Sequence, residues 1–458
     1  MAGIGFEIRK ILKKDSLSSI FEAYAYAGLI GSGPWVLSIL ALLVIGFISL
    51  GNVQPDIQIT QFLVMVTYLV GISLVLTGGM QLMFTRFVSD QMFIKQDDEI
   101  FPNLITLLIL FNLVVAVLSF FGFFWFEELM VSTRIVVVGC LILLCNLWLL
   151  VVFLSGMKRY KLIVGVMFIG YSAMVLLSMA LNSFGLLGLF ISFFIGNLFL
   201  VAAFLFAVVR EHSSDRFISF NSFNPKKSFW SLFVTGTCFN LAVWIDKVIF
   251  WFSPETSESI VGPLRVSIIY DFPIFLAYLS IIPGMAVFMV RMETDFAEAY
   301  ENFYDAIRNQ ASLQEMFQLK GEMVLVAKQG IYEIFKIQGI TMVALLIWGK
   351  NLLMWLGIDG HYAQLLYILL PGVALQVLLM SLLNILFYLD KRTTALLLAV
   401  VLLITNAVFS SLSVWAGPYF YGYGYTASML VTSLFGLYLL KFQFDDLEYN
   451  TFMLQGKN

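Results

Sequence analysis

Long apolar runs separated by short polar gaps dominate this chain. An α-helix rises about 1.5 Å per residue, so crossing roughly 30 Å of hydrocarbon takes about 20 apolar residues. Twelve runs have about this length, and we predict a membrane-spanning helix in each one. The predicted spans are 26–50, 61–85, 104–125, 135–156, 162–182, 186–209, 228–252, 266–290, 331–349, 363–388, 393–416 and 420–440.

The spans fall into two groups of six around the polar stretch 211–227. This layout is typical of transporters built from two related lobes around a central path. We therefore predict an all-α polytopic membrane protein with an N-lobe at 23–210, a linker at 211–227 and a C-lobe at 228–440. Residues 441–458 form a tail.

Composition and charge agree with this interpretation. The chain is 60% hydrophobic and 12% charged, and a soluble protein of 458 residues would carry more charge. Lys and Arg gather in alternate gaps, and the opposite gaps hold only Arg134, Arg265 and Lys350. Cytoplasmic loops retain positive charge, so we predict that both termini are cytoplasmic.

Residues 1–22 predict a cytoplasmic amphipathic helix. Four apolar residues recur at helical spacing with basic residues between them: Ile4, Ile8, Ile11 and Leu12. Such a helix lies in the interface of a lipid bilayer.

The gap 291–330, between spans eight and nine, is unusually long and contains no Pro. It predicts a cytoplasmic helical insertion, because it is rich in strong helix formers. An apolar stripe includes Phe296, Tyr300, Phe303 and Tyr304. Two interpretations stay open, an amphipathic hairpin on the membrane surface and a docking platform for a cytoplasmic partner.

The charged residues in span seven are the first candidates for a transport path or gate. Asp246 and Lys247 are adjacent within an apolar run, and charges at such depth usually face a protein interior or a cavity. Asn240 shares a helix face with Lys247, and Asp271 enters span eight from the same side, which predicts a Lys247–Asp271 ion pair. A purely structural pair, or snorkelling to the headgroups, is the alternative.

Pro and Gly residues predict irregular helices in three spans. Gly33 and Pro34 follow Gly31 and Ser32 in span one, and we expect a kink or break there that lines the path or serves packing. The pairs Pro283-Gly284 in span eight and Pro371-Gly372 in span ten predict further interruptions, which are hinge points for alternating access.

Two further candidate sites lie near the membrane interfaces. Arg86, at the inner end of span two, is a candidate contact for anionic groups or an ordinary interface anchor. Tyr421, Tyr423 and Tyr425, on the outer side before span twelve, are a candidate platform for stacking of sugar rings at the exit, with an aromatic belt as the alternative.

Several function classes are disfavoured. The chain contains no GxxxxGK[ST] phosphate-binding loop, and its histidines, His212 and His361, lie in separate gaps. The sequence therefore predicts no catalytic residues, no metal site and no cofactor. We expect a transporter in the lipid bilayer, and neither an enzyme nor a partner of nucleic acids.

The opening MAGIGFEIRKILKKDSLSS followed by AYAYAGLIGSGPWVLSIL closely resembles the PelG family. That family transports the Pel exopolysaccharide and is similar to polysaccharide transporters of the multidrug/oligosaccharidyl-lipid/polysaccharide (MOP) flippase superfamily, with a MATE-like fold. The resemblance implies a place in the cytoplasmic (inner) membrane, a cytosolic PelF-like glycosyltransferase, and PelD-like and PelE-like membrane partners. It also implies export of a growing, amino-sugar-rich polymer. An ion-coupled flippase of a lipid-linked oligosaccharide and a noncatalytic scaffold of a synthase complex remain alternatives.

Overall fold

The computed structural model describes residues 17–49, 53, 55, 57–157, 159–211, 214, 216–224, 228–355, 360 and 362–452. Most of the predicted amphipathic helix at 1–22 lies outside these residues, as do His212 and His361.

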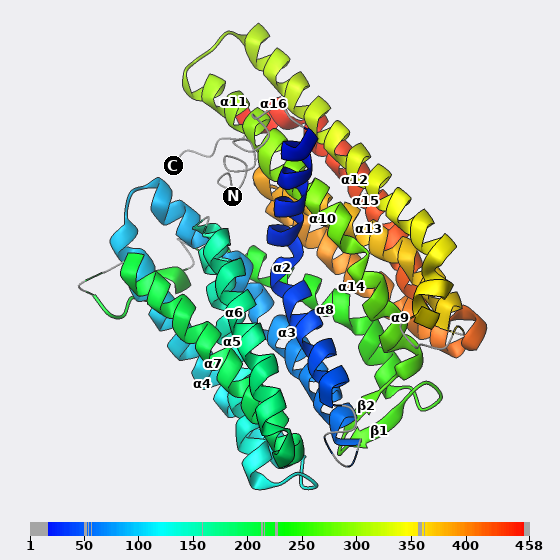
Figure 1. The fold of residues 1–458 in the computed structure, drawn as a ribbon. Helices are drawn as coiled ribbons and strands as arrows, with labels where there is room; N and C mark the ends of the chain where they lie inside the picture. Colours follow the sequence, from blue (N-terminus) through cyan, green and yellow to red (C-terminus); the bar gives the residue numbers. More distant parts are fainter. Residues whose placement is uncertain are drawn as a thin grey trace. The chain divides into compact units, whose positions relative to one another are not determined.

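The described chain is almost entirely helical (Figure 1). The long helices that precede the strands are α2 (Leu17–Ser49), α3 (Ile57–Phe93), α4 (Ile100–Phe123), α5 (Val131–Gly156), α6 (Tyr160–Leu181), α7 (Gly185–Glu211) and α8 (Trp230–Phe252). A hairpin of β1 (Glu258–Val261) and β2 (Leu264–Val266) follows, with antiparallel pairing.

The later helices are α9 (Ile268–Leu279), α10 (Ile281–Val290), α11 (Ala297–Arg308), α12 (Leu313–Trp355), α13 (Tyr362–Tyr388), α14 (Arg392–Trp415), α15 (Tyr423–Asp445) and α16 (Leu447–Phe452). A π-helix, η4 (Arg291–Phe296), connects α10 to α11. Short 3₁₀ turns lie at Asp97–Glu99, Asn182–Phe184, Asn221–Phe223 and Pro418–Phe420.

Ten helical segments of the described chain are long and apolar enough to cross a membrane. One of them, Tyr160–Glu211, contains both α6 and α7 and so covers two predicted spans. The described apolar part of α2, Val36–Ser49, is shorter. Eleven of the predicted spans each fall on one long helix and span eight falls on the two helices α9 and α10, which confirms the all-α polytopic membrane fold.

The chain forms two compact units, which we call the N-unit and the C-unit. The N-unit comprises 33–244 and 251–267, and the C-unit comprises 245–250, 268–452 and the described residues before Gly33. Helices α2 and α8 therefore contribute to both units. The boundary between the two units falls inside α2 and inside α8. The predicted lobe boundaries at 23–210 and 228–440 stay a prediction.

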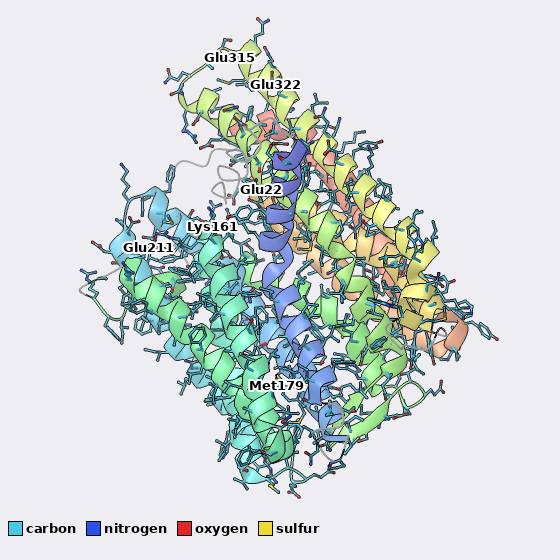
Figure 2. All side chains as sticks on the ribbon, in the orientation of Figure 1. Glu22, Lys161, Met179, Glu211, Glu315 and Glu322 are labelled. Carbon is cyan, nitrogen blue, oxygen red and sulfur yellow. The ribbon has the colours of Figure 1, made fainter. Side chains whose placement is uncertain are left out.

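The N-unit is built on α3, α5 and α7, with α6 against α7 and α4 against α5 (Figure 1). Its core contains Phe62, which meets Phe190 edge to face with ring centroids 5.1 Å apart. Lys161 and Glu211 lie at one end of this unit and Met179 lies toward the other (Figure 2). This agrees with the predicted alternation, in which the gaps after spans four and six share one side.

Glycines allow α3 and α8 to cross closely within the N-unit. A Cβ atom on Gly236 would lie 2.2 Å from the carbonyl oxygen of Gly78, and one on Gly78 would lie 2.2 Å from Nδ2 of Asn240. Real Cβ atoms do not approach other heavy atoms so closely, so only residues without a Cβ fit. Close contact matters here because helix association in lipid relies on van der Waals packing and interhelical hydrogen bonds.

The C-unit is organised around α13, which packs against α9, α10, α12 and α15, and α14 packs against α15. Gly372 of α13 faces α15, where a Cβ would lie 2.6 Å from the ring of Tyr425. The Thr426 hydroxyl donates to the Ile368 carbonyl at 2.7 Å, within the turn that precedes Pro371. Neighbouring helices commonly satisfy backbone groups near a proline in this way.

The predicted irregularities in spans eight and ten have different outcomes. Span eight is interrupted at Ser280, between α9 and α10. Pro283 falls in the first turn of α10, where its missing N–H leaves no hydrogen bond unmade. The prediction for span ten was wrong, because α13 runs through Pro371 without a break. Helix α2 is also continuous through Gly33 and Pro34.

The segment 291–330 is a helical hairpin that extends spans eight and nine. Helix α10 continues through η4 into α11, and α11 packs against α12 (Figure 1). Helix α12 has 43 residues, which corresponds to about 65 Å at the usual rise. The predicted helical insertion between spans eight and nine is therefore confirmed.

We predict that Gly236→Ala destabilises the protein by about 1–3 kcal/mol, because the added methyl group meets the backbone of α3. The measurement is thermal unfolding of the purified protein in detergent. Gly321→Ala in α12 is the matched control, since a Cβ at Gly321 meets no other atom within 4 Å. That control should be neutral or stabilising by about 0.5–1 kcal/mol. Equal midpoints for both variants would contradict the close crossing.

Candidate functional site

Asp246 and Lys247 form a buried ion pair on the part of α8 that belongs to the C-unit. Asp246 is 0% exposed and Lys247 is 6% exposed. The Lys247 Nζ atom lies 3.3 Å from both carboxylate oxygens of Asp246. Adjacent helical residues point about 100° apart, but the long lysine stem bends back to its neighbour. The sequence predicts Asp271 as the partner of Lys247, and the ion pair in the structure is with Asp246.

Two tyrosines of α9 form hydrogen bonds with this pair. The Tyr270 hydroxyl donates to Oδ2 of Asp246 at 2.6 Å. Lys247 donates to the Tyr278 hydroxyl at 3.0 Å, and its Nζ atom lies 4.9 Å from the centroid of the same ring. A buried ion pair is tolerated when additional hydrogen bonds satisfy its remaining lone pairs and protons. The tyrosines provide these bonds.

The network continues to α13 and α15. The Tyr425 hydroxyl donates to Oε1 of Gln376 at 2.6 Å, and a side-chain hydrogen bond also joins Tyr425 to Tyr278. One helical turn after Asp246, the Phe250 ring stacks on Tyr270 with centroids 3.9 Å apart. Helices α8, α9, α13 and α15 thus meet in one polar cluster with an aromatic wall.

The other residues predicted for a transport path lie elsewhere. Asn240 belongs to the N-unit, where its Nδ2 donates to the Gly236 carbonyl at 2.9 Å. Asp271 is half-buried and directly follows Tyr270 on α9. Gly33 and Pro34 lie at the point where α2 passes from the C-unit into the N-unit, and their surroundings are outside the described side chains.

Arg86, the candidate contact for anions, is partly engaged within its own helix. Its Nε atom lies 3.0 Å from Oδ1 of Asp90, and its guanidinium carbon lies 5.6 Å from the centroid of Phe229. Both groups of the ion pair are 38% exposed. An exposed pair of this kind contributes little to stability, and the contact of Arg86 with an anion stays a prediction.

The candidate sugar platform is mostly internal. Tyr421 and Tyr425 are buried, with Tyr421 edge-on to Phe250 at 5.2 Å between centroids. Stacking on a sugar requires an accessible ring. Of the predicted trio only Tyr423 is exposed, and Tyr419 beside it is 92% exposed. A sugar-stacking surface at this end would therefore use Tyr419 and Tyr423.

The aromatic stripe of the hairpin also points inward. Phe296 and Phe303 are buried, and Tyr300 packs on Tyr388 of α13 with centroids 5.5 Å apart. Tyr304 is half-buried and contacts Tyr300. These rings therefore hold the hairpin to its own unit, and a docking partner would meet the polar face of the hairpin.

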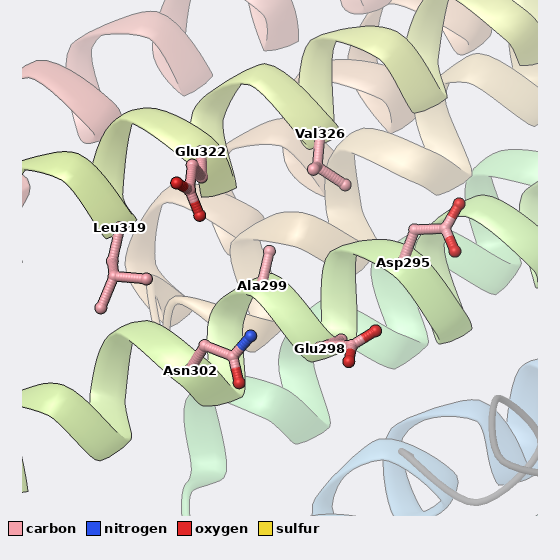
Figure 3. A pocket seen from close by; sticks show the side chains of 7 residues that line it. All are labelled: Asp295, Glu298, Ala299, Asn302, Leu319, Glu322 and Val326. Carbon is pink, nitrogen blue, oxygen red and sulfur yellow. The ribbon is translucent and has the colours of Figure 1, made fainter.

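That polar face includes a cleft between α11 and α12 of about 220 Å³ (Figure 3). Three carboxylates and one amide supply its polar groups: Asp295, Glu298, Glu322 and Asn302. Its negative charge would favour a basic partner surface. Among the described residues, no group of three or more His, Cys, Asp or Glu side chains is arranged to hold a metal ion.

The sequence interpretation missed Tyr270 and Tyr278 as members of the cluster. A signal was available, because a tyrosine hydroxyl within an apolar span needs a hydrogen-bond partner. The two tyrosines are eight residues apart, a spacing that brings them near one face of a helix. The two tyrosines bond to side chains of α8, and their spacing along α9 does not reveal which helix they face.

The sequence profile of the PelG family, described as an exopolysaccharide exporter (EPS-E), matches residues 1–452. The chain belongs to the PelG family. No curated protein matches the sequence.

Solved structures show the fold of this PelG family member. An inward-facing MATE family multidrug resistance transporter of the MOP superfamily has a TM-score of 0.65 and 11% identity, covering 90% of this chain and 95% of that chain. An outward-facing MATE family multidrug resistance transporter of the MOP superfamily has a TM-score of 0.65 and 12% identity, covering 93% of this chain and 96% of that chain. A MOP superfamily transporter from Pyrococcus furiosus has a TM-score of 0.61 and 12% identity, covering 93% of this chain and 96% of that chain. The likeness is to the MATE/MOP fold, and the chain is a multi-pass membrane transporter.

A double-mutant cycle tests the ion pair in this PelG family member. We predict that Lys247→Met destabilises the protein by about 3–5 kcal/mol, because it leaves the Asp246 carboxylate buried without its cation. Combining it with Asp246→Asn should recover most of that loss, since both charges are then absent. Thermal unfolding in detergent gives the four stabilities. Additive losses in the double variant would mean that the two side chains are not coupled.

Proposed function

We propose that this protein carries a nascent, amino-sugar-rich exopolysaccharide across the cytoplasmic membrane while a cytosolic glycosyltransferase extends it. Membership of an exopolysaccharide exporter family and the MATE/MOP fold support membrane transport of a polysaccharide. The sugar composition and the coupling to polymer synthesis are the parts that this proposal adds.

Charge compensation at Lys247 is the observation that carries the proposal. Among the Lys and Arg residues of the described spans, Lys247 lies well inside its span. Its ammonium group donates hydrogen bonds to Asp246 and to the Tyr278 hydroxyl. Lys336 lies near a span end. A carrier of a lipid diphosphate needs basic side chains in its central path to balance the phosphates. A path with a compensated cation suits a neutral or weakly cationic polymer.

The hairpin of α11 and α12 is the proposed docking element for the PelF-like glycosyltransferase. Its apolar stripe is used within the C-unit, so its polar face and the acidic cleft are what it offers to a partner (Figure 3). A basic surface on the glycosyltransferase would complement this charge. Both termini and the hairpin would face the cytoplasm, and PelD-like and PelE-like proteins would be the neighbours within the membrane.

A vesicle assay tests the transport step. Inverted membrane vesicles that contain this chain and the glycosyltransferase receive labelled nucleotide-sugar. We expect the polymer to become protected from added glycosidase only when this chain is present. Polymer that forms but stays digestible would contradict export. Protection of a lipid-linked oligosaccharide in place of free polymer would support the flippase alternative.

Charge reversal tests the docking element. We predict that Glu298→Lys together with Glu322→Lys reduces co-purification of the glycosyltransferase and lowers polymer export at least several-fold, because it reverses the charge of the cleft. The control pair, Glu127→Lys with Glu258→Lys, changes net charge equally at exposed positions of the N-unit. Equal co-purification of both pairs would place the partner elsewhere.

A further inference from the structure

Residues 216–224, which we call the strap, lie along the first turns of α4 and belong with them to the N-unit. The sequence places this stretch within the polar linker at 211–227. Three of its apolar side chains are nevertheless exposed, Phe217 at 68%, Ile218 at 54% and Phe220 at 60%. A contiguous group of exposed apolar side chains marks a surface that meets another molecule or a membrane.

The polar side chains of the strap are held by one carboxylate at the start of α4. Oε2 of Glu99 accepts hydrogen bonds from the Ser219 hydroxyl at 3.0 Å and from Asn221 Nδ2 at 2.9 Å. Its Oε1 atom accepts one from the Arg216 guanidinium at 3.1 Å. Hydrogen bonds to a charged acceptor are stronger than those between neutral groups, so Glu99 fixes the strap to α4.

Two buried polar side chains of α4 bind the backbone of the strap. The Asn103 Oδ1 atom accepts a hydrogen bond from the Ser222 amide at 2.8 Å, and the Thr106 hydroxyl accepts one from the Ser219 amide at 3.0 Å. Asn103 and Thr106 belong to the apolar helical segment Asp97–Phe123, where lipid offers polar groups no partner. The strap therefore satisfies polar groups of α4 at the depth where this membrane span begins.

The strap covers only the first part of one face of α4. Glu99, Asn103 and Thr106 share this face at a spacing of three and four residues. Leu113 and Val117 continue it, seven and eleven residues after Thr106, and they are 62% and 52% exposed. An exposed apolar face of a membrane span meets lipid. The strap thus lies on the lipid-facing side of α4, and its outward side chains continue that surface.

We propose that the strap is a membrane-surface anchor that inserts Phe217, Ile218 and Phe220 between the headgroups and the acyl chains of the bilayer. Amphipathic segments that lie in the membrane plane bury their apolar face by roughly 5–10 Å in this way. The Phe217 ring also meets Phe101 of α4 edge to face, with centroids 6.2 Å apart. The side chain of Arg216 is 76% exposed beside them, where lipid phosphates attract its charge.

The anchor explains why the linker between α7 and α8 combines exposed apolar side chains with a fully bonded polar face. Lipid takes up the apolar side, and α4 takes up the polar side. The connection between the two helices is therefore held to the N-unit and to the bilayer, and it is not a free tether. This inference concerns the bilayer and does not rest on the identity of the transported substrate.

Nitroxide labelling of the purified full chain in lipid nanodiscs tests the anchor without any partner protein. Ile218→Cys and Phe220→Cys are labelled singly in a Cys238→Ala background, because Cys140 and Cys145 are buried. Molecular oxygen concentrates among the acyl chains, whereas a charged nickel chelate stays in water. Both labels should collide with oxygen several-fold more often than with the chelate.

Glu315→Cys gives the matched control in the same background. Glu315 is exposed near the free end of the α11–α12 hairpin (Figure 2). Its label should show the opposite preference, for the nickel chelate over oxygen. Strap labels that behave like this control would place the three side chains in water and overturn the anchor. Strap labels shielded from both reagents would mean contact with protein, a second copy of the chain included, and would overturn it as well.

Removal of the Glu99 carboxylate tests how the strap is held. Glu99→Ala removes three hydrogen bonds to the strap, so the label at Phe220→Cys should become more mobile and several-fold more accessible to the chelate. Asp98→Ala, at the exposed neighbouring position, should leave both readings unchanged. Equal readings for the two variants would overturn the role of Glu99. The labels on the chain with Glu99 intact decide the membrane contact even if Glu99→Ala fails to fold.

Discussion

Polar groups inside long apolar helices must find their partners within the protein, because lipid offers none. The cluster around Asp246 depends on this constraint. Its carboxylate and the Lys247 ammonium pair with each other and with Tyr270 and Tyr278. Since these groups come from α8 and α9, and Gln376 and Tyr425 extend the cluster to α13 and α15, four helices of the C-unit are held in one register.

Close packing is the second condition for this arrangement. Gly372 lets the Tyr425 ring approach α13 to a distance that no side chain at that position would allow. In the N-unit, Gly78 and Gly236 have the same role where α3 crosses α8. Helices in lipid gain no hydrophobic free energy from meeting one another, so small residues at crossings contribute through van der Waals contact. By bringing the helix backbones close together, the glycines also fix where polar side chains such as Tyr425 and Asn240 lie.

The C-unit contains two buried carboxylates, Asp246 and Glu293, and their hydrogen-bond partners differ. Asp246 has an adjacent cation, the ammonium group of Lys247. Glu293 has two neutral donors and lies on a π-helix. The MATE/MOP fold supplies the helical framework for both, whereas the chemistry depends on residues of this chain. The hairpin of α11 and α12 extends directly from η4, so a partner bound there would lie on the same continuous element as Glu293.

The sequence by itself determined the helical spans, because apolar runs of about 20 residues leave the backbone in lipid no alternative to a helix. Its strong helix formers also indicated the helical insertion, and Pro283-Gly284 indicated an interruption of span eight. It also identified Asp246 and Lys247 as buried charges. Only the tertiary structure decided that Lys247 pairs with Asp246, that Phe296, Phe303, Tyr421 and Tyr425 point inward, and that Glu293 is enclosed. The physical reason is that membrane helices are apolar on all faces, so their sequence pattern does not mark the packed side. Apart from Asp246 and Lys247, which are neighbours in the sequence, the partners come from different helices, and only packing brings them together.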